Sequence, residues 1–201
     1  MATLLYIQSS IFNENGQSSQ LAATFIDTLK AKQPELTVVI RDVVADNLPH
    51  IDASIAGAFF TPEADRNNEQ QSIVERSDAL ISEIKAADYI VIGLPMYNFG
   101  IPSQLKAYFD QIARAGITFK YTDTGAVGLI DDKPVYLLTA RGGIHKDSGD
   151  YEVPYVKEYL GFLGLTSVET IYAEGLNMGD DVANKARAEA TKEIKSAVAS
   201  L

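Results

Sequence analysis

Tyr89-Ile90-Val91-Ile92-Gly93-Leu94 is a short, almost wholly apolar run, and it predicts a strand buried on both faces of a sheet. Four similar runs occur along the chain, so the five predicted strands are Thr3 to Gln8, Thr37 to Asp42, Tyr89 to Leu94, Pro134 to Thr139 and Ser167 to Ala173. Between them, apolar residues recur at helical spacing, as in Leu21, Phe25, Ile26 and Leu29, and in Ile73, Leu80, Ile81 and Ile84. This alternation predicts an α/β fold, a doubly wound five-stranded parallel sheet of order 2-1-3-4-5 with helices on both faces.

Two more helices are marked by their ends, and two segments do not fit simple crossovers. Pro102 stands near the start of one helix with Gly116 past its end, and an Ala-rich helix runs from Val182 to the C-terminus. Asn47 to Asn68 is too long for an ordinary connection and too apolar for a solvated loop. Phe119 to Leu129 is typical of a hairpin. Each insertion alone could be a packing feature, but together they suggest a dimer surface or a pocket wall.

Length and composition limit the classes of function. The chain of 201 residues suits a single domain, residues 1–201, and carries 17 Lys plus Arg against 27 Asp plus Glu, a formal charge of −10. This charge argues against nucleic acid or an anionic membrane as a partner. With no cysteine, there is no disulfide, thiolate metal site or Cys nucleophile. Without a signal peptide or an apolar run of membrane-spanning length, we expect a cytoplasmic protein.

Ligands of doubly wound sheets bind beyond the carboxyl ends of the strands, so the loops there are the candidate sites. The first loop, residues 9–19, is rich in hydroxyl and amide groups and leads into a helix, but it has no glycine-rich fingerprint and no P-loop lysine. A helix N-terminus of this kind can hold one phosphate through backbone N–H groups and neutral donors, as FMN would need. The alternative is that Ser18 or Ser19 only caps the helix.

The loops after the third and fourth predicted strands have different chemistry. Residues 95–102 place Met96, Tyr97 and Phe99 at a strand end, where a flat ring could rest against them, and Asn98 could bond to the ring edge. Residues 140–147 contain the pair Gly142 and Gly143, whose N–H groups can approach a ligand, together with the cations Arg141, His145 and Lys146. A glycine pair alone more often marks a turn, but a turn does not require the cations.

In these three loops the chain resembles the FMN-dependent NADH azoreductases, also described as NADH:quinone reductases. The residues that carry the resemblance are Ser10 with Gly16-Gln17-Ser18, then Pro95-Met96-Tyr97-Asn98-Phe99, then Arg141-Gly142-Gly143-Ile144-His145-Lys146-Asp147. The resemblance covers essentially the whole chain and implies a flavodoxin-like fold, a homodimer, FMN as cofactor, NADH or NADPH as donor, and quinones and azo compounds as acceptors. It assigns Ser10, Gly16, Gln17 and Ser18 to the FMN phosphate, Met96, Tyr97, Asn98 and Phe99 to the ring and ribityl chain, and Ala140, Arg141, Gly142 and Gly143 to the pyrimidine end. Gly16 and Ala140 stand where family members often carry a hydroxyl residue, but their backbone N–H groups remain.

The chemistry implied is two-electron transfer through the flavin, with hydride donor and acceptor binding in turn in a ping-pong cycle. His145 is the candidate catalytic residue, because a histidine can donate a hydrogen bond or a proton near neutral pH. A flavodoxin-type one-electron carrier is the alternative, although the apolar insertion and the cations after the fourth strand favour an enclosed substrate site. A phosphorylatable receiver domain would need acidic residues at the ends of the first and third strands, and Gln8-Ser9-Ser10 and Leu94-Pro95 supply none.

Overall fold

The computed structural model describes residues 1–201 and contains a five-stranded sheet in which every neighbouring pair is parallel. Its strand order is β2-β1-β3-β6-β7, which in chain order is the expected 2-1-3-4-5. The strands are β1 Thr3–Gln8, β2 Thr37–Asp42, β3 Tyr89–Pro95, β6 Val135–Ala140 and β7 Val168–Ala173. Each begins and ends within one residue of the predicted run, since the central strands are apolar on both faces and this pattern leaves little freedom in the assignment.

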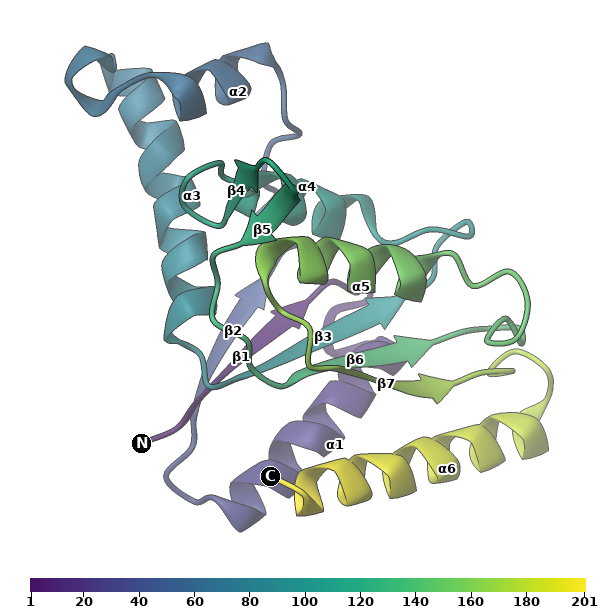
Figure 1. The fold of residues 1–201 in the computed structure, drawn as a ribbon. Helices are drawn as coiled ribbons and strands as arrows, with labels where there is room; N and C mark the ends of the chain where they lie inside the picture. Colours follow the sequence, from purple (N-terminus) through teal and green to yellow (C-terminus); the bar gives the residue numbers. More distant parts are fainter.

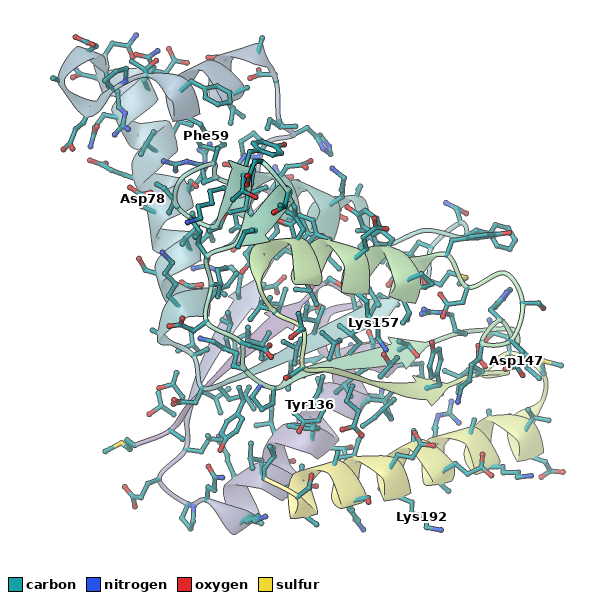
Figure 2. The ribbon with its side chains drawn as sticks, in the orientation of Figure 1. Phe59, Asp78, Tyr136, Asp147, Lys157 and Lys192 are labelled. Carbon is teal, nitrogen blue, oxygen red and sulfur yellow. The ribbon has the colours of Figure 1, made fainter.

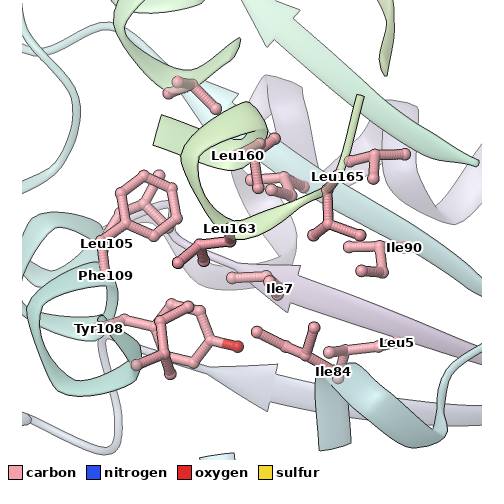
Figure 3. Close-up of a cluster of buried hydrophobic side chains, with 14 of the residues drawn as sticks. Leu5, Ile7, Ile84, Ile90, Leu105, Tyr108, Phe109, Leu160, Leu163 and Leu165 are labelled. Carbon is pink, nitrogen blue, oxygen red and sulfur yellow. The ribbon is translucent and has the colours of Figure 1, made fainter. Parts of the chain in front are cut away.

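Helices cover both faces of the sheet, as Figure 1 shows. On one face lie α1 Gln17–Lys32 and α6 Asp180–Ala199, and on the other lie α3 Asn68–Ala86, α4 Ser103–Ile112 and α5 Glu152–Leu163. Each face has its own core, of 16 buried residues under α1 and α6 and of 23 under the other three helices. Figure 3 shows the larger core, where side chains of α4 and α5 meet those of β1 and β3. The two helix layers hold the strands, and therefore the loops at their ends, in fixed positions.

The two insertions form small substructures outside this frame. Residues 47–68 contain α2 Ala53–Phe60 and the 3-10 turn η2 Glu63–Asp65, and they pack on the distal end of α3 through Ile55, Ala58, Ile73 and Val74. The predicted hairpin is confirmed as the antiparallel strands β4 Phe119–Thr122 and β5 Gly125–Gly128. A Cβ at Gly128 would lie 2.1 Å from the Gly164 backbone nitrogen, so only glycine lets the hairpin approach the end of α5.

Two helices differ from the sequence expectation. Helix α4 ends at Ile112 rather than reaching the vicinity of Gly116, because Arg114 N–H bonds to the Thr118 hydroxyl and the chain turns there. Helix α5 was not among the predicted helices. None of the helices combines the length and apolar character needed to cross a bilayer.

Candidate cofactor site

A cleft lies at the edge of the sheet where the carboxyl ends of β1, β3 and β6 meet. Eight of the proposed cofactor residues line it, namely Ser10, Gly16, Gln17, Met96, Tyr97, Ala140, Arg141 and Gly142. The other four, Ser18, Asn98, Phe99 and Gly143, belong to the same loops but lie outside the lining. The fold therefore brings together three loops that are far apart in the sequence, as the strand-end rule requires.

The first wall of the cleft is the N-terminus of α1, which follows the short 3-10 turn η1 Asn13–Asn15. Gly16 is the N-cap, no side chain caps the helix, and the ladder of helical hydrogen bonds begins with Gln20 N–H donating to Gly16. The alternative in which Ser18 or Ser19 caps the helix is therefore wrong. The Ser18 hydroxyl is fully buried and has no hydrogen-bond partner, and the first turn carries no acidic residue. Free N–H groups and an unpartnered hydroxyl at a positive helix end form an anion cradle.

Ser10 connects this cradle to the opposite loop. Its hydroxyl oxygen lies 3.2 Å from the Tyr97 hydroxyl and accepts a hydrogen bond from Phe12 N–H at 3.2 Å. The Tyr97 hydroxyl in turn accepts a hydrogen bond from Ile11 N–H at 3.3 Å. Gly16 lies so close that an added Cβ would be 2.1 Å from Ser10 Oγ and 2.7 Å from Ser10 Cβ. A side chain at position 16 is thus excluded while Ser10 holds this position.

The loop after β3 makes a tight reversal under the cleft. Tyr97 and Gly100 exchange backbone hydrogen bonds of 3.0 and 3.1 Å, while Asn98 and Phe99 adopt φ of 53° and 63°. This left-handed geometry costs an ordinary residue roughly 1–2 kcal/mol, and such strain concentrates at ligand sites. The turn projects the Phe99 ring into solvent with 69% of its surface exposed. The turn therefore leaves a large apolar ring next to the loop that lines the cleft, outside the core.

The loop after β6 offers backbone donors, and a loop that the sequence analysis did not consider supports it. The residues after β7 pair with it: Leu176 N–H donates to the Arg141 carbonyl at 3.1 Å and Asn177 N–H to the Gly142 carbonyl at 3.0 Å. The N–H groups of Gly142 and Gly143 have no partner within the chain. A Cβ at Gly142 would lie 2.6 Å from the Asn177 amide nitrogen, so this amide adds a donor beside the glycines.

The Arg141 side chain points away from the cleft, although its backbone helps to line it. Its guanidinium is buried, with Nη2 2.6 Å from Glu152 Oε2 and 3.7 Å from Asp150 Oδ1, and Nη1 donates to the Leu94 carbonyl at 2.9 Å. Burial raises the pKa of Glu152 to about 8, because desolvation outweighs the opposing effect of Arg141 and Asp150 raises the pKa further. This pair links the ends of β3 and β6 to the start of α5.

From the sequence we expected Arg141, His145 and Lys146 to bring positive charge to the cleft. The structure instead directs the side chains of Arg141 and Lys146 elsewhere. The Arg141 guanidinium is buried behind the cleft beside Glu152 and Asp150, and Lys146 Nζ lies 4.9 Å from the centre of the Tyr172 ring rather than at the cleft. The backbone N–H groups of His145 and Lys146 both donate to Glu174 Oε1, at 2.8 and 2.9 Å. Here, as at α1, neutral N–H groups rather than cationic side chains face the cleft.

His145 lies beside the cleft but does not line it. Its ring packs edge-on against Phe99 with 6.1 Å between ring centres, and a Cβ at Gly143 would lie 3.0 Å from its Nε2. The histidine thus contacts both the ring-side turn and the glycine loop. This position suits a group that meets a reactant at the mouth of the site.

Four lining residues were not assigned to the cofactor from the sequence: Phe12, Pro95, Leu176 and Asn177. Phe12 and Pro95 lie inside loops that the sequence analysis selected. Leu176 and Asn177 follow β7, and the strand-end rule that selected the other loops would have selected this one as well.

A doubly wound sheet with an anion cradle after β1 and an aromatic turn after β3 defines a flavodoxin-like, mononucleotide-binding class of protein. A family model described as "Flavodoxin-like fold" matches residues 2–198. The chain belongs to the flavodoxin-like family of FMN-dependent NADH:quinone oxidoreductases. It is 56% identical to the "FMN-dependent NADH:quinone oxidoreductase" of Cellvibrio japonicus, over 99% of this chain and all of the relative. The protein of the same name from Alcanivorax borkumensis is also 56% identical, over 95% of this chain and 97% of the relative.

Solved structures agree with this assignment. The azoreductase of Bacillus anthracis superposes over the full length of both chains with a TM-score of 0.91 and 32% identity. An FMN-dependent NADH-azoreductase from the same species, solved in complex with FMN, has a TM-score of 0.88 and 29% identity, covering 99% of this chain and 98% of its own.

Proposed function

We propose that this chain is an FMN-dependent oxidoreductase that transfers two electrons from NADH, or NADPH, to quinones and azo compounds. The observation that carries the proposal is the cradle at the start of α1, where no side chain caps the helix and no acidic side chain occupies the first turn. A phosphate would satisfy the free N–H groups of this helix end without a cationic side chain in contact with it. The names of the relatives, FMN-dependent NADH:quinone oxidoreductase, support the same assignment.

The remaining residues of the cleft fit the other parts of FMN. Ser10 and Gln17 stand beside the cradle and would complete the phosphate site. Met96, Tyr97 and the strained turn of Asn98 and Phe99 offer an apolar face for a ring. The free N–H groups of Gly142 and Gly143, with the backbone of Ala140 and Arg141, would meet the polar pyrimidine edge.

When bound, FMN supplies the two-electron chemistry, and the chain supplies position and electrostatics. The free N–H groups of Gly142 and Gly143 would stabilise negative charge at the pyrimidine edge, because they are fixed before the reaction begins. Arg141 and Glu152 hold the two ring-binding loops together from behind. His145, at the mouth of the cleft beside Phe99, is the residue that we propose to donate a hydrogen bond or a proton to a reactant.

A flavodoxin-type one-electron carrier has less support. The relatives that share 56% identity with this chain are named as oxidoreductases, and the structural neighbours are azoreductases. Exposed apolar side chains also favour an enclosed reactant site: Phe12, which lines the cleft, and Phe99, in the turn after β3, are each more than half exposed.

We also propose that the protein is a cytoplasmic homodimer of a single domain. The apolar insertion leaves Ile51 and Phe60 exposed, with Phe60 at 79%, on a segment that extends beyond the sheet in Figure 1. Exposed apolar surface of this kind is typical of an interface between copies. The absence of cysteine suits a reducing compartment, where the reduced nicotinamide donor would be at hand.

The test is to purify the protein, identify any flavin released on denaturation, and follow NADH oxidation with a quinone and with an azo dye. We expect FMN as the main flavin and oxidation that requires both flavin and acceptor. FAD as the main flavin, or no oxidation with either acceptor, would contradict the proposal.

A further inference from the structure

Gln17, the first residue of α1, contacts a cation that lies 170 positions away in the sequence. Arg187 of α6 donates a hydrogen bond from Nε to Gln17 Oε1 at 2.9 Å, and its Nη1 donates to Asn184 Oδ1 at 3.4 Å. Gln17 lines the cofactor cleft on one side and, on the other, a small cavity between α1 and α6 that Arg187 also lines. The glutamine therefore stands between the cleft and the guanidinium.

This contact fixes the orientation of the Gln17 amide. A guanidinium has only donors, so it must face the amide oxygen and not the amide nitrogen. The Gln17 Oε1 atom is thereby engaged, while Nε2 has no hydrogen-bond partner within the chain. A donor oriented in this way suits an anion in the cleft, whereas a flipped amide would present an acceptor to it.

The charge of Arg187 is also available. The hydrogen-bond partners of the Arg187 side chain are the neutral amide oxygens of Gln17 and Asn184, and it forms no ion pair with a carboxylate. It is half-buried next to the N-terminus of α1, in a protein with a formal charge of −10. An uncompensated cation behind a helix N-terminus adds to the positive potential that the helix dipole creates there.

From this geometry we propose that Arg187 is a positioning residue for the FMN phosphate, one that holds the Gln17 amide as a donor and supplies the cationic charge missing from the cradle itself. Arg187 does not touch the phosphate but acts through Gln17 and through its field. It thereby favours a phosphorylated flavin over riboflavin. The inference rests on the proposed binding of FMN.

The test compares two ligands that differ only in the phosphate. FMN-free protein is titrated with FMN and with riboflavin, and dissociation constants are read from flavin fluorescence. Arg187→Met removes charge and donor but keeps the apolar stem. We expect its dissociation constant for FMN to rise about tenfold, within the range of charge effects at helix ends, while that for riboflavin changes less than about twofold.

Two further variants separate charge and orientation from general stability. Arg187→Lys keeps the charge but loses the planar donor, so we expect an intermediate loss of FMN affinity. Lys192→Met is the matched control, because Lys192 is an exposed lysine on the same helix, and Figure 2 shows it directed away from α1. It should leave the affinity for both flavins unchanged.

Equal weakening of FMN and riboflavin by Arg187→Met would overturn the inference, because the arginine would then only join α1 to α6. An unchanged FMN affinity would overturn it as well, while leaving the proposed function intact. A parent protein that binds neither flavin would refute the proposed function, and with it the role of Arg187.

Discussion

The contact between Gly16 and Ser10 gives a sharp test of the cradle geometry. Gly16 has φ of −66° and ψ of 141°, which any residue can adopt, so the Gly16→Ala change meets no backbone strain. Its methyl group would nevertheless lie 2.1 Å from Ser10 Oγ and 2.7 Å from Ser10 Cβ. Rotation of the hydroxyl can relieve the first contact but not the second, because Cβ is fixed to the backbone. The loop after β1 must therefore move.

Two effects of opposite sign decide the magnitude. Overpacking of this kind costs about 1–3 kcal/mol, whereas replacing glycine by alanine gains about 0.4–1 kcal/mol by restricting the unfolded chain. The gain affects folding only. The cost appears as lost FMN affinity if the displaced loop has to return when the flavin binds. We therefore expect the dissociation constant for FMN to rise about 5-fold to 150-fold.

The assay is a fluorescence titration with FMN, combined with urea unfolding of the flavin-free protein. Gly57→Ala in α2 is the control, since nothing lies within 4 Å of its added Cβ, and it should leave FMN affinity unchanged. In a Ser10→Gly background the clash is absent, so Gly16→Ala should then have little further effect. FMN binding by Gly16→Ala within twofold of the parent, or the same loss in both backgrounds, would refute the reasoning.

Three other predictions follow from burial and charge. Because the pKa of Glu152 is raised to about 8, the folded protein holds a proton that the unfolded chain releases, so this group lowers stability as pH rises from about 5 to 8. In urea unfolding across that range, Glu152→Gln should remove a slope of at most about 1.4 kcal/mol per pH unit, and parallel curves for the two proteins would contradict this. Gly128→Ala should lower the free energy of unfolding by about 3 kcal/mol, because the backbone of Gly164 cannot yield, and a midpoint equal to that of the parent would exclude the close approach. Phe60→Asp should shift sedimentation towards monomer, whereas Ile40→Asp, at an exposed apolar site on β2, should not; an unchanged dimer in Phe60→Asp would remove α2 from the proposed interface.

Most of the sheet could be predicted from the sequence because its central strands are apolar on both faces. Runs such as Tyr89 to Leu94 are short and bounded by polar residues, so their limits are set locally. Helix α5 was missed although Val153, Val156, Leu160 and Leu163 recur at helical spacing, since Pro154 and Gly161 interrupt the pattern. Pro154 is compatible with the helix because it lies in the first turn of α5, where a proline breaks no helical hydrogen bond.

The position of the cofactor loops could also be predicted, but not the direction of their side chains. The strand-end rule placed the loops containing Ser10, Tyr97 and Gly142 around one cleft. That Arg141 points inward depends on Glu152, whose position follows from the docking of α5. Likewise, the nearest cation to the cradle in sequence order is Lys30, whereas folding brings Arg187 there from α6. Contacts of this kind arise from tertiary packing, which local pattern does not encode.

The central claim, that this chain is an enzyme of two-electron transfer and not a one-electron carrier, is tested most directly by an anaerobic titration of the FMN-loaded protein with NADH. Free N–H groups at Gly142 and Gly143 would stabilise negative charge at the pyrimidine edge, so we expect the flavin to bleach fully and in proportion to NADH added. Addition of a quinone should restore the yellow colour. A flavin that NADH leaves oxidised, or a long-lived one-electron-reduced flavin, would contradict the account.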